Sequence, residues 1–272
     1  MCIVEFTGSP YSGKSFYTNL LENELTNEGY PVFNYKKNIF YNIHHAYKLN
    51  IFEKLFFYLS KNRIKSDEQH SLKSKKKIQL SSQSKKLKIT SLDQKKIFNK
   101  ILNEFIEENT ELDLLINEFF KKNKFEKNRE KELIRWQKNL SVSKKIIEKS
   151  SKRKIIIDSE GFIHRLNSYL LQNSDDLFID KYLYLVPKPD ILVYVNEDIN
   201  ECFERLENID NLANKKLTKV KIKIFKANCE KVFLKYSKKN FITFEINKEN
   251  FSEEKKNIIK SIKKIYENST PD

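Results

Sequence analysis

The chain has 272 residues, of which 39% are hydrophobic, and 52 Lys and Arg against 37 Asp and Glu give it a formal net charge of +15 at pH 7. This length suits one α/β domain with an insertion or two small domains, and the absence of an apolar stretch of about 18 residues excludes a membrane-spanning helix. The charge favours polyanionic partners such as nucleic acid, although lysines mixed with glutamates along helices are equally typical of a solvated surface.

The N-terminal residues predict a strand, a loop and a helix in that order. Cys2 to Thr7 is a short apolar, β-branched run typical of a buried strand. Gly8-Ser9-Pro10-Tyr11-Ser12-Gly13-Lys14-Ser15 fits the phosphate-loop pattern G-x-x-x-x-G-K-[ST] at every fixed position. The residues after the loop that recur at helical spacing are Phe16, Leu20, Leu21 and Leu25.

The residue types of this loop suit the binding of a nucleotide triphosphate with magnesium. Gly8 and Gly13 allow backbone conformations that turn successive N–H groups toward a phosphate, and the helix that follows directs its N-terminus at the same anion. Lys14 would reach the outer phosphates, and the hydroxyl of Ser15 would ligate Mg²⁺. We expect ATP and Mg²⁺ as cofactors, and the remaining predicted contacts to the nucleotide are Ser9, Ser12 and Phe16.

The first helix is predicted to end at Glu28-Gly29, with residues 30–35 forming a second strand. From 38 to 150 the pattern changes to long amphipathic helices, and we interpret this segment as a helical insertion that binds the acceptor or a partner. The apolar stripes comprise Ile51, Leu55, Phe56 and Leu59; Ile97, Ile101, Leu102, Phe105 and Ile106; Leu112, Leu115, Ile116, Phe119 and Phe120; and Leu133, Ile134, Trp136, Leu140, Ile146 and Ile147.

Two further features of the insertion are a basic segment and a pair of histidines. Residues 61–88 carry ten Lys or Arg against two acids, with clustered Ser. We interpret them as a mobile basic segment, with nucleic acid or an acidic substrate as the alternative partner. The pair His44-His45 has no third ligand at metal spacing and is interpreted as structural.

A second candidate site segment runs from Lys154 to Gly161. Three Ile residues followed by Asp158 are typical of a buried strand that delivers a carboxylate to the magnesium of a phosphate-loop protein. Glu160, two residues on, could orient an attacking hydroxyl, hold the metal in place of Asp158, or cap the next helix. Arg165 would either face the transferred phosphate or lie on the surface.

The C-terminal part continues the alternation of strands and helices. Strands are predicted at 190–195 and 241–246, and helices run through Cys202, from 215 to 236 and near Ile258. Five strands separated by helices predict a three-layer α/β sandwich with ligands at the strand C-terminal ends. The three cysteines are widely separated and odd in number, which indicates a reducing compartment, most simply the cytoplasm.

These residues resemble the P-loop kinase group, and within it the thymidylate kinase-like branch of nucleotide kinases. The resemblance covers roughly 1–37 and 152–266, so that 1–37 and 151–272 form the expected nucleotide-binding core around the insertion 38–150. It implies a five-stranded parallel sheet in the order 2-3-1-4-5 and a mobile lid after the helix of Arg205. The matching stretches are Gly8–Ser15, Glu28-Gly29-Tyr30-Pro31-Val32, Ile155–Asp158, Pro189–Val195 and Glu204-Arg205-Leu206.

The chain departs from the thymidylate kinase pattern in two places. Ser159 stands where that pattern has an Arg that helps to hold the acceptor phosphate. The lid region 207–219 contains Lys215, Lys216 and Lys219 but no Arg. The negative charge of the transition state would then have to be stabilised by Lys, by Arg205 or by Arg165. Lys supplies charge but lacks the planar guanidinium with which Arg binds two oxygens at once. Within the long insertion, Arg129 and Arg135 are the candidate acceptor ligands.

The sequence therefore predicts a Mg-ATP-dependent phosphotransferase in which Lys14, Asp158, Glu160, Arg205 and Arg165 act in catalysis. The expected acceptor is a small or nucleotide-like molecule, a sugar conjugate or a polynucleotide end. The alternative is a P-loop ATPase that acts as a nucleotide-regulated module binding nucleic acid or protein. A GTPase is disfavoured because 247–250 lacks the acid of the guanine motif, and sulfotransferases of this fold usually lack a complete Gly-Lys-Ser loop.

Overall fold

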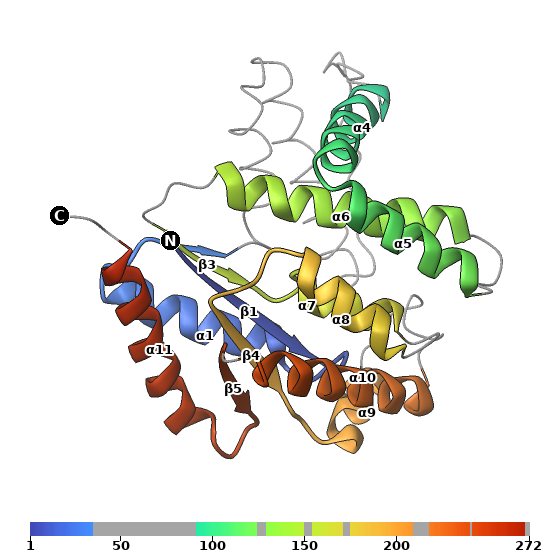
Figure 1. Ribbon diagram of the computed structural model, residues 1–272. Coiled ribbons are helices and arrows are strands. Elements are labelled where there is room, and N and C mark those ends of the chain that lie inside the picture. The colour runs from blue at the N-terminus through green and yellow to red at the C-terminus, as the bar shows by residue number, and fades with distance from the viewer. Residues whose placement is uncertain are drawn as a thin grey trace, which may run out of the picture.

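The predicted apolar runs form one five-stranded parallel sheet in the order β2-β3-β1-β4-β5, as the resemblance implied (Figure 1). The computed structural model describes residues 1–34, 91–123, 129–149, 154–170, 175–208, 218–239 and 241–269. The strands are β1 (Cys2–Gly8), β2 (Val32–Asn34), β3 (Ile155–Asp158), β4 (Ile191–Val195) and β5 (Ile242–Ile246).

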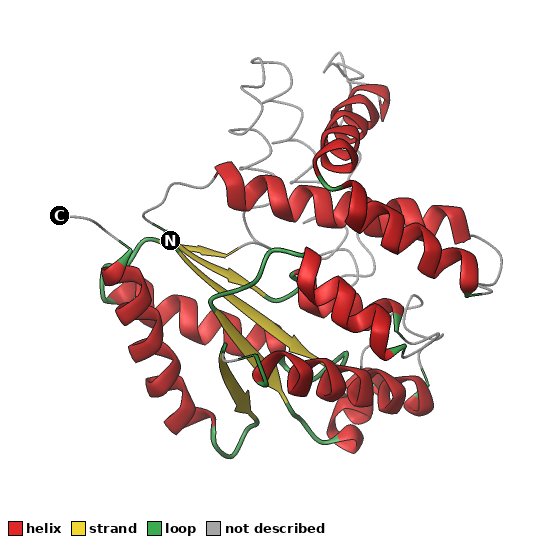
Figure 2. Cartoon of the chain, in the orientation of Figure 1, coloured by secondary structure: helices red, strands yellow, loops and turns green. Residues whose placement is uncertain are grey.

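Helices cover both faces of this sheet and make the three-layer sandwich (Figure 2). On one face lie α1 (Lys14–Asn27) and α11 (Phe251–Asn268). The other face carries α7 (Phe162–Tyr169), α8 (Asp176–Leu185) and α10 (Lys219–Ser237), while α9 (Ile199–Glu207) follows β4 and packs against α10. Alternation along β4 explains the two cores, because Ile191 and Val193 face α11 whereas Leu192 and Tyr194 face α10.

The described part of the predicted insertion packs onto this second face. It consists of α4 (Ser91–Glu108), α5 (Thr110–Lys122) and α6 (Arg129–Lys149). Trp136 of α6 is fully buried, stacks on Tyr169 of α7 with ring centroids 4.2 Å apart, and lies 5.6 Å from the ring of Tyr182 of α8. These helices therefore share one hydrophobic core with α7 and α8. The stripe at 51–59, the basic segment 61–88 and His44-His45 lie outside the described residues.

The first helix ends as predicted but buries a different face. Gly29 has a φ of +87° directly after the C-cap residue Glu28, which suits glycine. The predicted stripe included Phe16 and Leu20, yet these side chains are 61% and 36% exposed. The buried residues Tyr17, Leu21 and Leu25 follow one another at intervals of four, and Phe16 and Leu20 lie about 100° around the helix from them.

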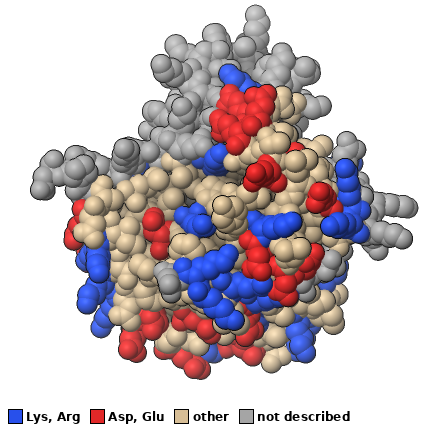
Figure 3. Space-filling view, viewed as in Figure 1, with Lys and Arg blue, Asp and Glu red and all other residues tan. Residues whose placement is uncertain are grey.

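Acidic and basic side chains are interspersed on the face shown in Figure 3. Two lysines of α10 pair with acids of α8. Lys231 pairs with Asp176 of α8 at 3.1 Å, and Lys235 pairs with Asp180 at 2.9 Å. Among the helices that the structure describes, none combines the length and the apolarity that crossing a membrane requires.

Candidate nucleotide-binding site

The phosphate loop joins the end of β1 to the start of α1 in a conformation that requires its glycines. Gly8 and Gly13 have φ values of +154° and +92°. A Cβ atom on Gly8 would lie 2.7 Å from the carbonyl oxygen of Val195. Lys14 folds back across the loop, where its Nζ donates to the carbonyl oxygens of Gly8 at 2.9 Å and Ser9 at 2.7 Å. The loop thus forms a tight cradle with a lysine over it.

The other predicted loop residues differ in exposure. Ser9 and Ser12 are buried, and the Ser9 hydroxyl lies 3.5 Å from Cys202 Sγ. The Ser12 hydroxyl is buried inside the loop and has no hydrogen-bond partner within the described part of the chain, which fits a site for an anion's oxygen. Ser15 is exposed on the first turn of α1 beside the exposed Phe16. The Ser12 hydroxyl, the Lys14 ammonium and the N-terminus of α1 therefore suit a phosphate, and the exposed Ser15 hydroxyl is the oxygen that this loop would offer to Mg²⁺.

The acid-bearing turn follows β3, which lies next to the loop strand. Asp158 is only 6% exposed, and its Oδ1 accepts the backbone N–H of Glu160 at 2.8 Å. Asp158 pairs in register with Glu5 of β1, which precedes Gly8 by three residues. The backbone of Asp158 therefore lies roughly 10 Å along the strand direction from the start of the loop. Glu160, two residues further on, is exposed.

Glu5 is a buried acid that the sequence analysis did not single out, although a lone carboxylate in an apolar strand was a usable signal. Its Oε1 accepts the backbone N–H of His164, in the first turn of α7, at 2.7 Å. A Cβ atom on Gly161 would lie 2.5 Å from its Oε2. Burial, and then the charge of Asp158, raise the pKa of Glu5 to about 8, and burial raises the pKa of Asp158 to about 6.

Arg165 lies on α7 close to both buried acids. Its backbone N–H donates to the Gly161 carbonyl at 3.0 Å. Its positive charge acts to lower the pKa values of Glu5 and Asp158, whereas burial raises them. The Nε atom of Arg165 is buried and has no hydrogen-bond partner among the described residues. The structure thus brings Arg165 to the acid-bearing turn.

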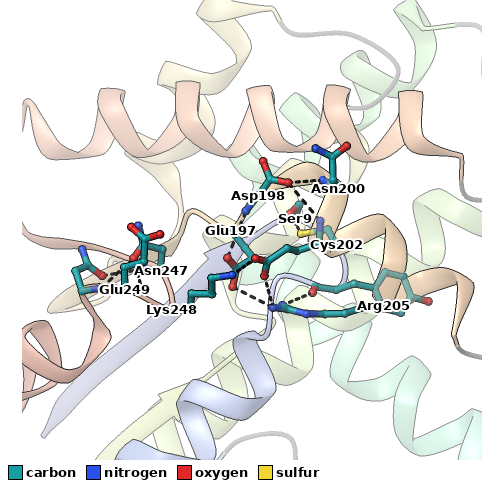
Figure 4. A network of polar contacts seen from close by, with 12 residues as sticks. Ser9, Glu197, Asp198, Asn200, Cys202, Arg205, Asn247, Lys248 and Glu249 are labelled. Atoms are coloured by element: carbon teal, nitrogen blue, oxygen red, sulfur yellow. Dashed lines mark hydrogen bonds and ion pairs between the residues drawn. The ribbon is translucent and has the colours of Figure 1, made fainter.

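Arg205 lies on the other side of the loop, within a network of polar side chains (Figure 4). Its Nη1 donates to the carbonyl oxygen of Tyr11 at 3.1 Å. Its Nη2 donates to Glu197 at 3.2 Å and to Glu201 at 3.0 Å. Glu201 also pairs with Lys248, which follows β5. Arg205 therefore joins the loop, through Tyr11, to two acids after β4.

Several predicted residues cannot be placed at the site. The side chains of Arg129 and Arg135, and the whole of Lys215 and Lys216, lie outside the described residues. Lys219 begins α10, and its Nζ lies 5.9 Å from the ring centroid of Phe203. Within the described ranges, no three His, Cys, Asp or Glu side chains cluster as a metal site.

No protein-family model and no curated protein sequence matches the chain. Solved structures of deoxyadenosine kinase from M. mycoides are similar to it at low identity. The structure with bound dATP is 15% identical, covers 91% of each chain and has a TM-score of 0.42. The structure with bound dCTP is 14% identical, covers 96% of this chain and 99% of that one, and has a TM-score of 0.43.

The fold can be assigned from the chain's own features. A phosphate loop follows β1, and β3 and β4 flank that strand in a parallel sheet. The loop and the sheet order together give this chain the three-layer P-loop NTPase sandwich that the sequence predicted.

Proposed function

We propose that this protein is a Mg-ATP-dependent phosphotransferase that moves the γ-phosphate to a nucleotide-like, sugar-conjugate or polynucleotide-end acceptor. The observation that carries the proposal is the phosphate loop. Lys14 folds over it, and the loop is so closely packed at Gly8 that a Cβ atom there would clash with the carbonyl oxygen of Val195. In this proposal Lys14 would neutralise the outer phosphates, and Ser15 and Asp158 would hold the metal. Bound Mg²⁺ would supply charge neutralisation at the transferred phosphate.

On the acceptor side we assign Glu160 and Arg165. Glu160 is exposed at the turn after β3, so its carboxylate is available to orient an acceptor hydroxyl or to accept its proton. Arg165 sits one helical turn after Gly161 and would face the transferred phosphate. Catalysis of this kind depends mainly on positioning and on charge.

We further propose that the segment 38–150 builds the acceptor site. The support comes from its last described helix, α6. Ile147 of α6 lines a small cavity together with Glu5, Asp158 and Gly161. The insertion therefore ends against the turn that carries the candidate acids.

The test is transfer of a labelled γ-phosphate from Mg-ATP to pooled nucleosides, nucleoside monophosphates, sugars and 5′-hydroxyl oligonucleotides. Wild type is compared with Lys14→Ala and with Lys260→Ala, an exposed lysine of α11. We expect labelled product from wild type and Lys260→Ala, and a loss of about 10²–10³ in rate for Lys14→Ala.

The product would identify the acceptor class. Release of free phosphate alone, lost in Lys14→Ala, would instead support the ATPase alternative. Equal turnover by wild type and Lys14→Ala, or no turnover by either, would contradict the proposal.

A further inference from the structure

We infer that Arg205 is a positioning residue, which holds the phosphate loop in its binding conformation through the carbonyl of Tyr11. The inference rests on the proposed function, because this loop is the proposed phosphate site. It gives Arg205 a role that acts through the loop, in place of direct contact with the transferred phosphate.

The first observation is the backbone of Tyr11. Its φ of +64° lies in the left-handed region, and no other non-glycine residue that the structure describes has a positive φ. L-residues with a large side chain rarely adopt this conformation, so it persists only where the surroundings enforce it. Tyr11 packs against a buried cluster formed by Cys202 and Leu206 of α9 and Ile222 of α10. The side chain thus anchors the loop to two helices.

The second observation is the set of partners of Arg205. Its Nη1 donates to the Tyr11 carbonyl, and this atom lies 3.6 Å from the position a Cβ on Gly13 would take. The guanidinium therefore lies against the loop backbone on both sides of Ser12. Its Nη2 donates to Glu197 and Glu201, and two carboxylates with one carbonyl fix the plane of a guanidinium more firmly than any single acceptor.

The third observation is that Glu197 and Glu201 each have a lysine partner besides Arg205. Glu197 is 3% exposed, and the Nζ of Lys226 on α10 donates to its carbonyl oxygen at 2.7 Å. Glu201 pairs with Lys248. Two carboxylates beside Arg205 also cancel its charge locally, which makes it a weak ligand for phosphate but a strong clamp on the loop.

These two roles of Arg205 predict opposite effects of removing the charge of Glu197. If Arg205 contacted phosphate directly, Glu197→Gln would free its positive charge and strengthen anion binding. If Arg205 positions the loop, Glu197→Gln replaces one charged acceptor of its Nη2 with a weaker neutral one. The guanidinium and the loop are then held less firmly, and anion binding weakens although a negative charge has been removed.

The experiment is calorimetric titration of the full chain with Mg-ATP and with magnesium tripolyphosphate, which has no base and so reports on the loop alone. The variants are Glu197→Gln, Arg205→Met and the double variant. The matched control is Glu204→Gln, an exposed acid on the same helix. Glu201→Gln repeats the test if Glu197→Gln does not fold, since Glu201 is more exposed.

We expect Glu197→Gln to bind tripolyphosphate up to about tenfold more weakly than wild type, as the exchange of a charge-assisted hydrogen bond for a neutral one implies. The double variant should bind as Arg205→Met does, and Glu204→Gln should bind as wild type does or slightly more tightly. Tighter or unchanged binding by Glu197→Gln, with wild type binding both ligands, would overturn this inference alone. A wild type that binds neither ligand would overturn the proposed function.

Discussion

At the scale of single residues, the buried carboxyl of Glu5 links the two halves of the candidate site. It lies on the loop strand, pairs in register with Asp158 and accepts the first-turn N–H of His164. The helix N-terminus provides the hydrogen bond that a buried carboxylate needs. Glu5 therefore fixes the start of α7 and the turn that carries Asp158 and Glu160.

We expect the free energy of unfolding to fall as the pH rises from 4.5 to about 8. The folded chain keeps the Glu5 proton up to a pKa of about 8, while the unfolded chain releases it near the ordinary value of 4.5, so the folded state binds the extra proton only in this interval. Glu5→Gln cannot titrate and should remove most of the decline, which we expect to be roughly 2–4 kcal/mol.

Urea denaturation of wild type and Glu5→Gln across this interval, in buffer with a chelator, measures the effect. A smaller decline should remain in the variant, because the pKa of Asp158 is raised to about 6. Wild type and variant with the same pH dependence would show that Glu5 is not the group responsible.

Gly161→Ala should destabilise the fold by about 1–3 kcal/mol through overpacking. The backbone φ of −72° at Gly161 suits alanine, so the cost arises from the Cβ atom 2.5 Å from the Glu5 carboxylate. In a Glu5→Ala background this contact is absent, and the same substitution should cost much less. Equal costs in the two backgrounds, measured by urea denaturation, would rule out the contact as the cause.

At the scale of elements, α8, α9 and α10 each begin after a side chain that accepts backbone N–H groups of the first turn. Asp175 precedes α8 and accepts from Leu177 at 3.0 Å and from Phe178 at 3.4 Å. Phe178 stacks on Phe119 of α5 with centroids 4.1 Å apart. The start of α8 is therefore also the place where the insertion joins the core.

Asp175→Ala should lower the free energy of unfolding by about 1 kcal/mol, because two N–H groups of α8 lose their acceptor. Asp175→Asn keeps an acceptor oxygen at the same position and should lose only a small part of that. Chemical denaturation of the three proteins at one pH provides the comparison. An equal loss in both variants would point to the charge rather than to the cap.

At the scale of the whole molecule, the described part of the predicted insertion and the helices on one face of the sheet share one hydrophobic core. Phe120 of α5, Trp136 of α6, Leu166 of α7 and Tyr182 of α8 belong to a single buried cluster that also contacts β4. Neither part could lose its partner without exposing a large apolar surface. The two segments separated in the sequence analysis therefore meet in one buried core in the described structure.

Unfolding should accordingly follow a single transition. Trp136 is the only tryptophan of the chain, so its fluorescence reports on α6, whereas far-UV circular dichroism reports on all helices and strands. Because the core is shared, the two signals should change at the same urea concentration. A fluorescence change that precedes the circular dichroism change would show that the insertion unfolds by itself.

The sequence by itself determined the phosphate loop, the five strands and the described helices other than α8, because these depend on residues near one another in the chain. The loop motif and the periods of apolar residues act over a few turns or a few strand positions. The resemblance carried by these residues also gave the sheet order, which the structure confirms.

The tertiary structure alone decided which residues surround the loop. Glu5 meets His164 across 159 sequence positions, and Arg205 meets Tyr11 across 194. Periodicity also placed Phe16 in the apolar stripe of the first helix, where the structure leaves it exposed. A local pattern states which side chains are apolar or charged, but their partners follow from strand register and from the helices that cover each face of the sheet.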